Sequence, residues 1–197
     1  MDEICLFPLP LVIFPGGKLP LQIFEKRYLD MIRQCLKEDK GFGLTMIESG
    51  DQIIRNDQQA SPLIASMGTY CRIVDFDQKA NGLLQIVLEG ERKFNILSQS
   101  ENVDRLMIAK VNFIDAEVDS QIPDSKKHLA ELLISLASHV STLDIIFDDE
   151  SALEVGSRLS ELLPCANLFK QQMLELMDPL LRLTHLEDQV LKMQEEV

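Results

Sequence analysis

Basic residues are scarce in this sequence, in which 19 Lys and Arg stand against 32 Asp and Glu for a formal net charge of −13. Residues 1–120 carry −5 of this balance and residues 121–197 carry −8, and no run of Lys or Arg is longer than two. Nucleic acids and anionic membranes attract proteins through basic side chains. We therefore expect neither as a partner, and we interpret the negative charge as a source of solubility.

Long apolar runs and paired cysteines are also missing. No stretch approaches the ~20 apolar residues of a membrane-spanning helix, and the first residues lack the basic and then apolar pattern of a secretory signal. Cys5, Cys35, Cys71 and Cys165 are widely spaced and form no Cys-x-x-Cys pair. The sequence predicts a cytoplasmic protein with four reduced thiols.

Catalytic motifs are absent as well. Gly17-Lys18 lacks the glycine five residues earlier that a phosphate-binding loop requires, and no G-x-S-x-G elbow occurs. His128 and His139 would lie ~16 Å apart along one helix, too far for a shared metal ion. The acidic run 148–150 more simply complements the positive start of a helix. We expect no catalytic residue, metal or cofactor, although a nucleophile and its base could still meet in three dimensions.

The first 120 residues have the pattern of short strands. Pro8, Pro10 and Pro15 exclude a helix at the start, and Pro15-Gly16-Gly17 predicts a turn. Strands are expected at 42–47, 64–76, 83–88, 94–97 and 106–114. Asn81-Gly82 predicts a tight hairpin, and Gly90 a bulge or sharp bend. Strands of this length and spacing predict a small barrel or a strongly bent sheet.

One helix is expected within this β-rich part, near residues 25–38, with Gly41 ending it. Its apolar residues have the spacing of a single helical stripe: Tyr28, Met31, Ile32, Cys35 and Leu36. This part carries seven phenylalanines, most of which are expected in the core: Phe7, Phe14, Phe24, Phe42, Phe76, Phe94 and Phe113.

Helical periodicity returns after a polar boundary at residues 118–124. A first helix, carrying a leucine stripe from Leu129 to Val140, is expected to be capped by Asp124 or Ser125. Ser151-x-x-Glu154 predicts a capping box. Asn167 is expected to cap a third helix, and Asp178-Pro179 to start a fourth. The sequence thus predicts an α+β protein, with a β-barrel over residues 1–120 and a four-helix part over residues 121–197.

The opening residues resemble a known family. Phe7-Pro8-Leu9, V-I-F-P-G at 12–16 and L-P-L-Q-I-F-E-K-R-Y at 19–28 are similar to the first signature of the Lon-protease N-terminal domain. The likeness continues at Gly68-Thr69, at 88–94, and in the helical segments 157–164 and 171–183. It covers nearly the whole chain.

This resemblance implies a PUA-like pseudo-barrel followed by a helical bundle. In full-length proteases the domain helps to select protein substrates and supports hexamer assembly, and the ATPase and protease domains follow it. Because this chain ends at Val197, we expect a stand-alone bacterial member. Arg27 of the signature is expected to hold a carboxylate or a strand-end carbonyl, since its planar fork suits fixed acceptors.

We therefore predict a non-catalytic module that binds unfolded or partner protein segments, with a separate Lon-type protease as a possible partner. An apolar turn can be a binding edge for such segments, although it could equally pack against the helical part. The site is predicted in the crease between barrel and helices, at Phe14, Pro15, Gly16, Leu19, Leu21, Arg27 and Gly82. The alternatives are an RNA-binding PUA-like protein, which the charge disfavours, and a small hydrolase.

Overall fold

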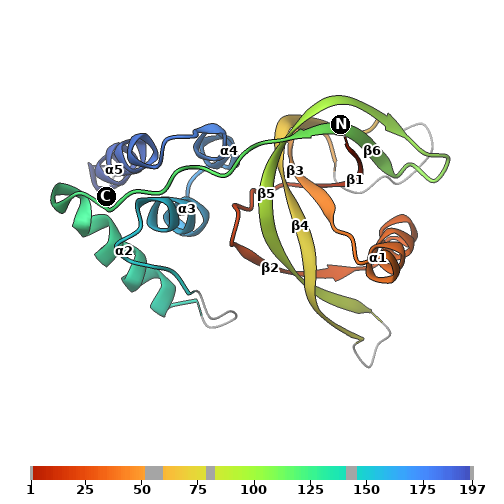
Figure 1. The fold of residues 1–197 in the computed structure, drawn as a ribbon, viewed down its shortest axis with the longest axis horizontal. Helices are drawn as coiled ribbons and strands as arrows, with labels where there is room; N and C mark the ends of the chain where they lie inside the picture. The colour runs from red at the N-terminus through yellow and green to blue at the C-terminus, as the bar shows by residue number, and fades with distance from the viewer. Residues whose placement is uncertain (1, 52–59, 79–82, 141–145, 196–197) are drawn as a thin grey trace. The chain divides into compact units, whose positions relative to one another are not determined.

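The computed structural model describes residues 2–51, 60–78, 83–140 and 146–195. The chain divides into two compact units, Met1–Asp115 and Ala116–Val197 (Figure 1). Within the described ranges, no helix has both the length and the apolar character needed to cross a membrane. The elements are β1 (Asp2–Leu9), β2 (Lys18–Ile23), α1 (Lys26–Glu38), β3 (Phe42–Ser49), β4 (Leu63–Gln78), β5 (Leu84–Glu101), β6 (Met107–Phe113), a 3₁₀ turn η1 (Asp124–Lys126), α2 (Lys127–Ser138), α3 (Ala152–Leu162), α4 (Asn167–Glu175) and α5 (Pro179–Glu195).

The predicted α+β architecture is confirmed, and the sheet is closed. The strands of the first unit run in the order β2-β5-β4-β3-β1-β6, and the second half of β5 also pairs with β6. This last pairing joins the ends of the series β5-β4-β3-β1-β6 into a small barrel. Only β1 and β3 are parallel among the described pairs. β2 lies outside the closed series, along the first half of β5.

The two strands expected at 83–88 and 94–97 are in fact one long strand, β5, which bends near Gly90. Opposite it, Tyr70 pairs with Arg92 and Cys71 with Gly90, so that Glu91 has no counterpart in β4. An extra residue of this kind is a β-bulge, which bends a strand and increases its twist. The glycine therefore marks a bend, as predicted, but it does not end the strand.

The turn before β2 is fastened to this bend. The Gly16 N–H donates to the Gly90 carbonyl at 2.7 Å, and the Gly90 N–H donates to the Gly17 carbonyl at 2.9 Å. A Cβ atom on Gly90 would lie 2.3 Å from the Phe14 carbonyl oxygen. Only glycine permits two backbones to approach this closely.

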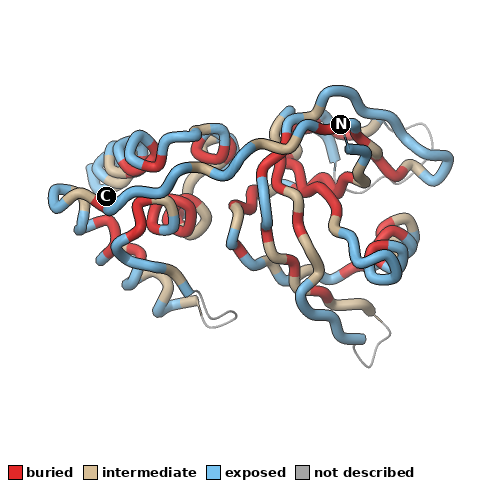
Figure 2. The backbone as a smooth tube through the Cα atoms, viewed as in Figure 1, coloured by how far each residue is buried: buried red, intermediate tan, exposed pale blue. Residues whose placement is uncertain are grey.

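The helix α1 packs its stripe into the larger core cluster of the first unit, and Figure 2 shows the buried residues along the strands that face it. Tyr28, Met31, Ile32 and Cys35 are buried as predicted, and Phe7 stacks on Tyr28 with ring centroids 4.0 Å apart. Leu36 is 39% exposed, because a residue eight positions after Tyr28 is rotated about 80° from it around the helix axis.

The end of α1 differs from the prediction. The residue in the left-handed conformation is Asp39, with φ of 52°, rather than Gly41. Glycine is required at position 41 for a steric reason, because a Cβ atom there would lie 2.1 Å from the Cys71 carbonyl oxygen. The glycine thus permits close packing of the chain against β4.

In the second unit, α3 packs against α2, α4 and α5 (Figure 1). The fully buried Arg182 of α5 holds this unit together: its Nη2 donates to both Glu117 oxygens at 2.7 Å, and its Nε donates to the Met173 carbonyl at 2.9 Å. The same Nη2 lies 2.6 Å from the Leu176 carbonyl. One guanidinium thereby satisfies carbonyls that the end of α4 leaves without helical partners.

The predicted helix starts are confirmed in part. Asp178 caps α5 by accepting from the Leu180 and Leu181 N–H groups, at 2.9 and 3.2 Å. Asn167 is the first residue of α4, so Ala166 is the cap residue instead. Asp124 and Ser125 do not cap α2 because they form the preceding 3₁₀ turn.

The capping box at α3 is only half formed. The Ser151 hydroxyl accepts from the Glu154 N–H at 3.0 Å, but the Glu154 carboxylate turns to the Asp148 N–H, 2.7 Å away. The Ser151 N–H, which a complete capping box would pair with Glu154, donates to the Asp148 carbonyl at 3.2 Å. Asp119 adds a further cap by accepting from the Ser151 hydroxyl at 2.7 Å and from the Leu153 N–H at 3.0 Å. Burial acts to raise the pKa of Asp119, but these hydrogen bonds outweigh it and lower the pKa below its usual value.

The contact at Gly90 predicts a stability loss. We expect Gly90→Ala to lower the free energy of unfolding by about 1–3 kcal/mol, because the new methyl group meets backbone that cannot move aside. Urea unfolding measures the change, with Ser98→Ala at an exposed position of β5 as the control. Equal stability of the two variants would show that the turn yields easily.

The cap at Asp119 predicts a pH dependence. At neutral pH we expect Asp119→Asn to cost about 1 kcal/mol, as other cap losses do. Because the folded-state pKa is lowered, the carboxylate stabilises the fold above its unfolded pKa, and this contribution is lost as pH falls through the folded pKa. The difference from wild type should therefore shrink in acid.

Urea titrations followed by helical circular dichroism measure this difference, with Asp149→Asn as the control at an exposed carboxylate. A gap between wild type and Asp119→Asn that stays constant down to about pH 2.5 would contradict the assignment.

Candidate functional site

The apolar turn predicted as a binding edge is part of the fold. Phe14 is completely buried, Pro15 is half-buried and Gly16 is exposed with φ of 75°. The Thr69 hydroxyl donates to the Ile13 carbonyl at 2.6 Å, and the backbone contacts at Gly90 secure the other side. The Phe14 side chain is therefore not available to a ligand at the surface of the unit.

The other residues predicted for the binding site lie on two different elements, β2 and α1, except for Gly82. Leu19 and Leu21 lie half-buried on β2, opposite Leu88 and Ile86 of β5. Arg27 lies at the start of α1, and Gly82 lies outside the described residues.

Arg27 has the kind of acceptors predicted for it. Its Nη2 donates to the Glu25 carboxylate at 2.9 Å, its Nη1 donates to the Arg105 carbonyl at 2.8 Å, and its guanidinium lies 4.5 Å from the centroid of the Tyr28 ring. The side chain is only 9% exposed. Its position on the helix and these two acceptors favour a structural role.

Arg105 continues the network across the turn between β5 and β6. Its backbone is left-handed with φ of 66°, a costly conformation for a residue with a Cβ atom. Its Nε donates to Glu101 at 2.7 Å, and its Nη2 donates to the Ser61 hydroxyl at 2.9 Å. The sequence offers no signal for this residue, since its role depends on contacts between distant segments.

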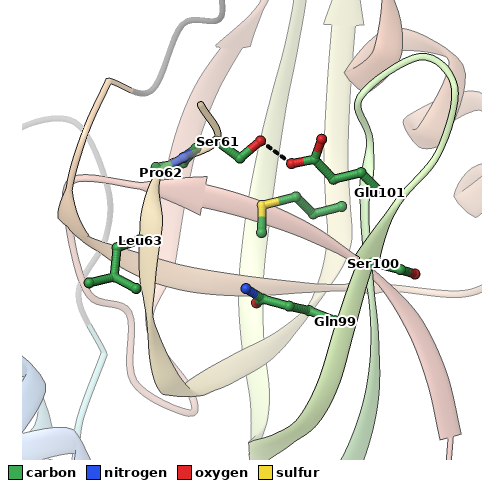
Figure 3. Close-up of a pocket in the computed structure, with 7 residues that line it drawn as sticks. Ser61, Pro62, Leu63, Gln99, Ser100 and Glu101 are labelled. Atoms are coloured by element: carbon green, nitrogen blue, oxygen red, sulfur yellow. Dashed lines mark hydrogen bonds between the residues drawn. The ribbon is translucent and has the colours of Figure 1, made fainter. Parts of the chain in front are cut away.

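Two hollows lie on either side of this network. One, of about 350 Å³, lies beside α1 and is lined by Cys5, Arg27, Cys35 and Tyr70 among others. The other, of about 380 Å³, lies between residues 61–63 and 99–101. Figure 3 shows the Ser61 hydroxyl and the Glu101 carboxylate of this second hollow pointing toward each other and forming a hydrogen bond.

The two thiols of the first hollow are not activated nucleophiles. Burial raises the pKa of Cys5, and it raises the pKa of Cys35 to about 11. At neutral pH both thiols are therefore protonated and poorly reactive. Within the described part of the chain, no three His, Cys, Asp or Glu side chains are grouped to hold a metal ion.

Exposed apolar side chains instead occur at the far end of the β4–β5 hairpin. We call the three-stranded region formed by β2, residues 72–78 of β4 and residues 84–89 of β5 the distal ribbon. Figure 2 shows that the end of β4 in this hairpin is exposed, whereas the facing part of β5 is intermediate or buried. On β4, Val74 is 49% and Phe76 is 59% exposed, and Phe24 just after β2 is 56% exposed.

The expectation that most phenylalanines of the first unit fill the core is confirmed, and Phe24 and Phe76 are the exposed exceptions; the buried ones are Phe7, Phe14, Phe42 and Phe94. Phe76 lies opposite Ile86, which in turn lies opposite Leu21, so the three side chains form a row across the ribbon. Ile86 is buried, but among the described residues no strand pairs with β4 on the other side of Phe76. The sequence contained a signal for the exposure of Phe76, because the strand predicted at 64–76 is much longer than the strand predicted at 42–47 and must extend beyond it.

A family model matches nearly the whole chain, and curated proteases match a part of it. The model of the "ATP-dependent protease La (LON) substrate-binding domain" matches residues 3–192. The Lon protease of Cytophaga hutchinsonii is 25% identical over 126 residues, which are 64% of this chain and 14% of that protein. Lon protease 2 of Myxococcus xanthus is 24% identical over 110 residues, 56% of this chain and 13% of that protein. The aligned part is thus about a seventh of these relatives.

Solved structures show the same fold. A Lon N-terminal domain protein from Xanthomonas campestris superposes with a TM-score of 0.76 at 29% identity, covering 95% of this chain and 98% of that one. The N-terminal domain of the Mycobacterium avium complex Lon protease superposes with a TM-score of 0.59 at 17% identity, covering 95% and 97%. The second likeness concerns the fold alone.

The Arg27 network predicts a local effect of a conservative substitution. We expect Arg27→Lys to lower the free energy of unfolding by about 1–2 kcal/mol, because an ammonium group cannot reach both acceptors as a planar fork does. Amide hydrogen exchange should also increase in the turn at residues 102–106, which the Arg27 contact holds. Urea unfolding and exchange measure the two effects.

The control is Arg33→Lys on the exposed face of the same helix, where the arginine side chain is 74% exposed. A surface pair contributes less than about 1 kcal/mol, so little change is expected there. If both variants behaved alike, Arg27 would not hold the turn.

Proposed function

Because this chain belongs to the family of ATP-dependent protease La (LON) substrate-binding domains, we propose that it is a non-catalytic cytoplasmic module that binds unfolded or partner protein segments. The proposal also includes cooperation with a separate Lon-type protease. Support comes from the family model and from the curated relatives, which are Lon proteases that match 64% and 56% of this chain.

The observation that carries the proposal is the exposed apolar surface of the distal ribbon. Phe76 and Val74 expose about half of their side-chain surface on a strand that is otherwise anchored in the barrel. Unfolded segments expose apolar residues that native proteins bury, and a rigid apolar surface offers them a partner. The family and this surface thus favour the same activity.

The arrangement of charge gives further support. Several arginines are engaged by carboxylates: Arg27 by Glu25, Arg105 by Glu101 and Arg182 by Glu117. Their charge is therefore used within the fold, and the net charge of −13 remains unfavourable for phosphate backbones. A protein ligand fits this surface better than a nucleic acid.

The proposal predicts that a single surface side chain matters. We expect Phe76→Ser to weaken the binding of a reduced and alkylated, permanently unfolded protein by about tenfold, because aromatic anchors dominate binding energies. Fluorescence anisotropy with the labelled unfolded protein measures this dissociation constant. Circular dichroism should show an unchanged fold, since the replaced ring is 59% exposed.

The matched control is Leu191→Ser on α5 of the second unit, a leucine that is 54% exposed. This variant should bind as the wild type does. Equal losses in both variants would assign binding to general surface hydrophobicity, and no binding by the wild type would contradict the proposed function.

A further inference from the structure

The last part of β4 has an unpaired backbone edge. Along one side β4 pairs with β5 as far as Gln78, whereas along the other side its pairing with β3 ends at Cys71, opposite Phe42. Among the described residues, no strand lies along this other side of residues 72–77 (Figure 1). We call this side the free edge of β4. Such an edge presents N–H and C=O groups to which another strand can pair.

The other edge of the distal ribbon is less suited to strand pairing. β2 forms that edge, and it carries Pro20 in its middle. Proline has no N–H to donate, and it is one of the devices by which proteins protect edge strands. The free edge of β4 contains no proline. Of the two edges, the one on β4 is therefore the better template.

The Phe76 amide shows in which direction a backbone donor on the free edge of β4 points. The Phe76 N–H donates to the carboxylate of its own neighbour, Asp75, at 2.9 Å. An amide in the ladder with β5 would donate to a carbonyl of that strand instead. The Phe76 amide is thus directed away from β5, and a flexible, exposed carboxylate occupies it. An incoming carbonyl could replace this carboxylate as the acceptor.

The charges at this edge select the kind of strand that would pair. Asp75 and Asp77 are exposed and lie two residues apart, so they share one face of the strand. Residues 73–78 and 84–89 contain no Lys or Arg, and nearby Arg72 is already ion-paired with Asp39. Phe76 lies between the two acids and provides an apolar contact.

We propose that the free edge of β4 binds an extended segment of a partly unfolded protein as an additional β-strand, and that this segment alternates basic and apolar side chains. Its basic residues pair with Asp75 and Asp77, its apolar residues contact Phe76, and its backbone completes the ladder. This inference rests on the proposed function and names the segment chemistry and the binding mode.

The test uses the whole chain and a short fluorescent peptide of alternating lysine and valine. A second peptide has every backbone nitrogen methylated, so it keeps the side chains and charges but has no backbone N–H to donate. A third replaces lysine with glutamate. We expect both altered peptides to bind at least about tenfold more weakly than the first, as the loss of several hydrogen bonds or of charge pairing requires.

Protein variants localise the site. The double variant Asp75→Asn/Asp77→Asn should weaken the lysine peptide several-fold, whereas Asp149→Asn/Asp188→Asn, which removes the same charge from exposed positions of the second unit, should not. Phe76→Pro should bind more weakly than Phe76→Ala, because both variants lose the aromatic ring but only Phe76→Pro also loses the backbone N–H. If Phe76→Pro fails to fold, the methylated peptide still decides the question.

Each outcome has one meaning. Equal binding of the methylated and unmethylated peptides would overturn strand addition while leaving a protein-binding surface intact. Equal binding of the glutamate peptide would overturn the basic preference. If the wild-type chain bound the permanently unfolded protein but neither lysine peptide, the segment chemistry would be wrong, and failure to bind that protein would reject the proposed function itself.

Discussion

The bend of β5 at Gly90 is the feature on which the first unit depends. Before the bend, at residues 84–89, β5 pairs with β2 and β4. After it, at residues 94–101, β5 pairs with β6, and its pairing with β4 continues to Asn95. A straight strand could not serve both halves, because closing a small sheet into a barrel requires strong bending and twist. The bulge at Glu91 provides the bend, and the hydrogen bonds from Gly16 and Gly17 secure it. The distal ribbon projects as a consequence, since the barrel closes without it.

The family signature and the proposed binding surface use different residues. Glu25 and Arg27 of the signature join the start of α1 to the strained turn at Arg105, and Phe14 fills the core. These contacts support the architecture and leave little of those side chains for a ligand. The distal ribbon is anchored in the core by Ile86 and Leu88, whereas Phe76 and Val74 on the same ribbon are about half exposed. A shared fold can in this way serve relatives with different substrates.

The second unit relies on a buried ion pair. The side chains of Arg182 and Glu117 are only 0% and 6% exposed. The guanidinium also donates to two carbonyls in the region where α4 ends. Burying charge is costly unless every group finds partners, so this arrangement tolerates few alternatives. It specifies how the extended segment before α2 lies against the helices.

The sequence by itself determined the order of the elements, the buried stripe of α1 and the caps at Ser151 and Asp178, because each depends on residues within one or two turns. The tertiary structure decided which phenylalanines are exposed, and the length of the strand predicted at 64–76 was the one hint of it in the sequence. Phe14 and Phe76 are equally apolar, but Phe14 is completely buried and Phe76 lies beyond the last pair that β4 forms with β3. The contacts of Arg27 with Arg105 and of Arg182 with Glu117 join residues 78 and 65 positions apart. No local pattern encodes such pairs, since they form only when the barrel closes and the helices pack.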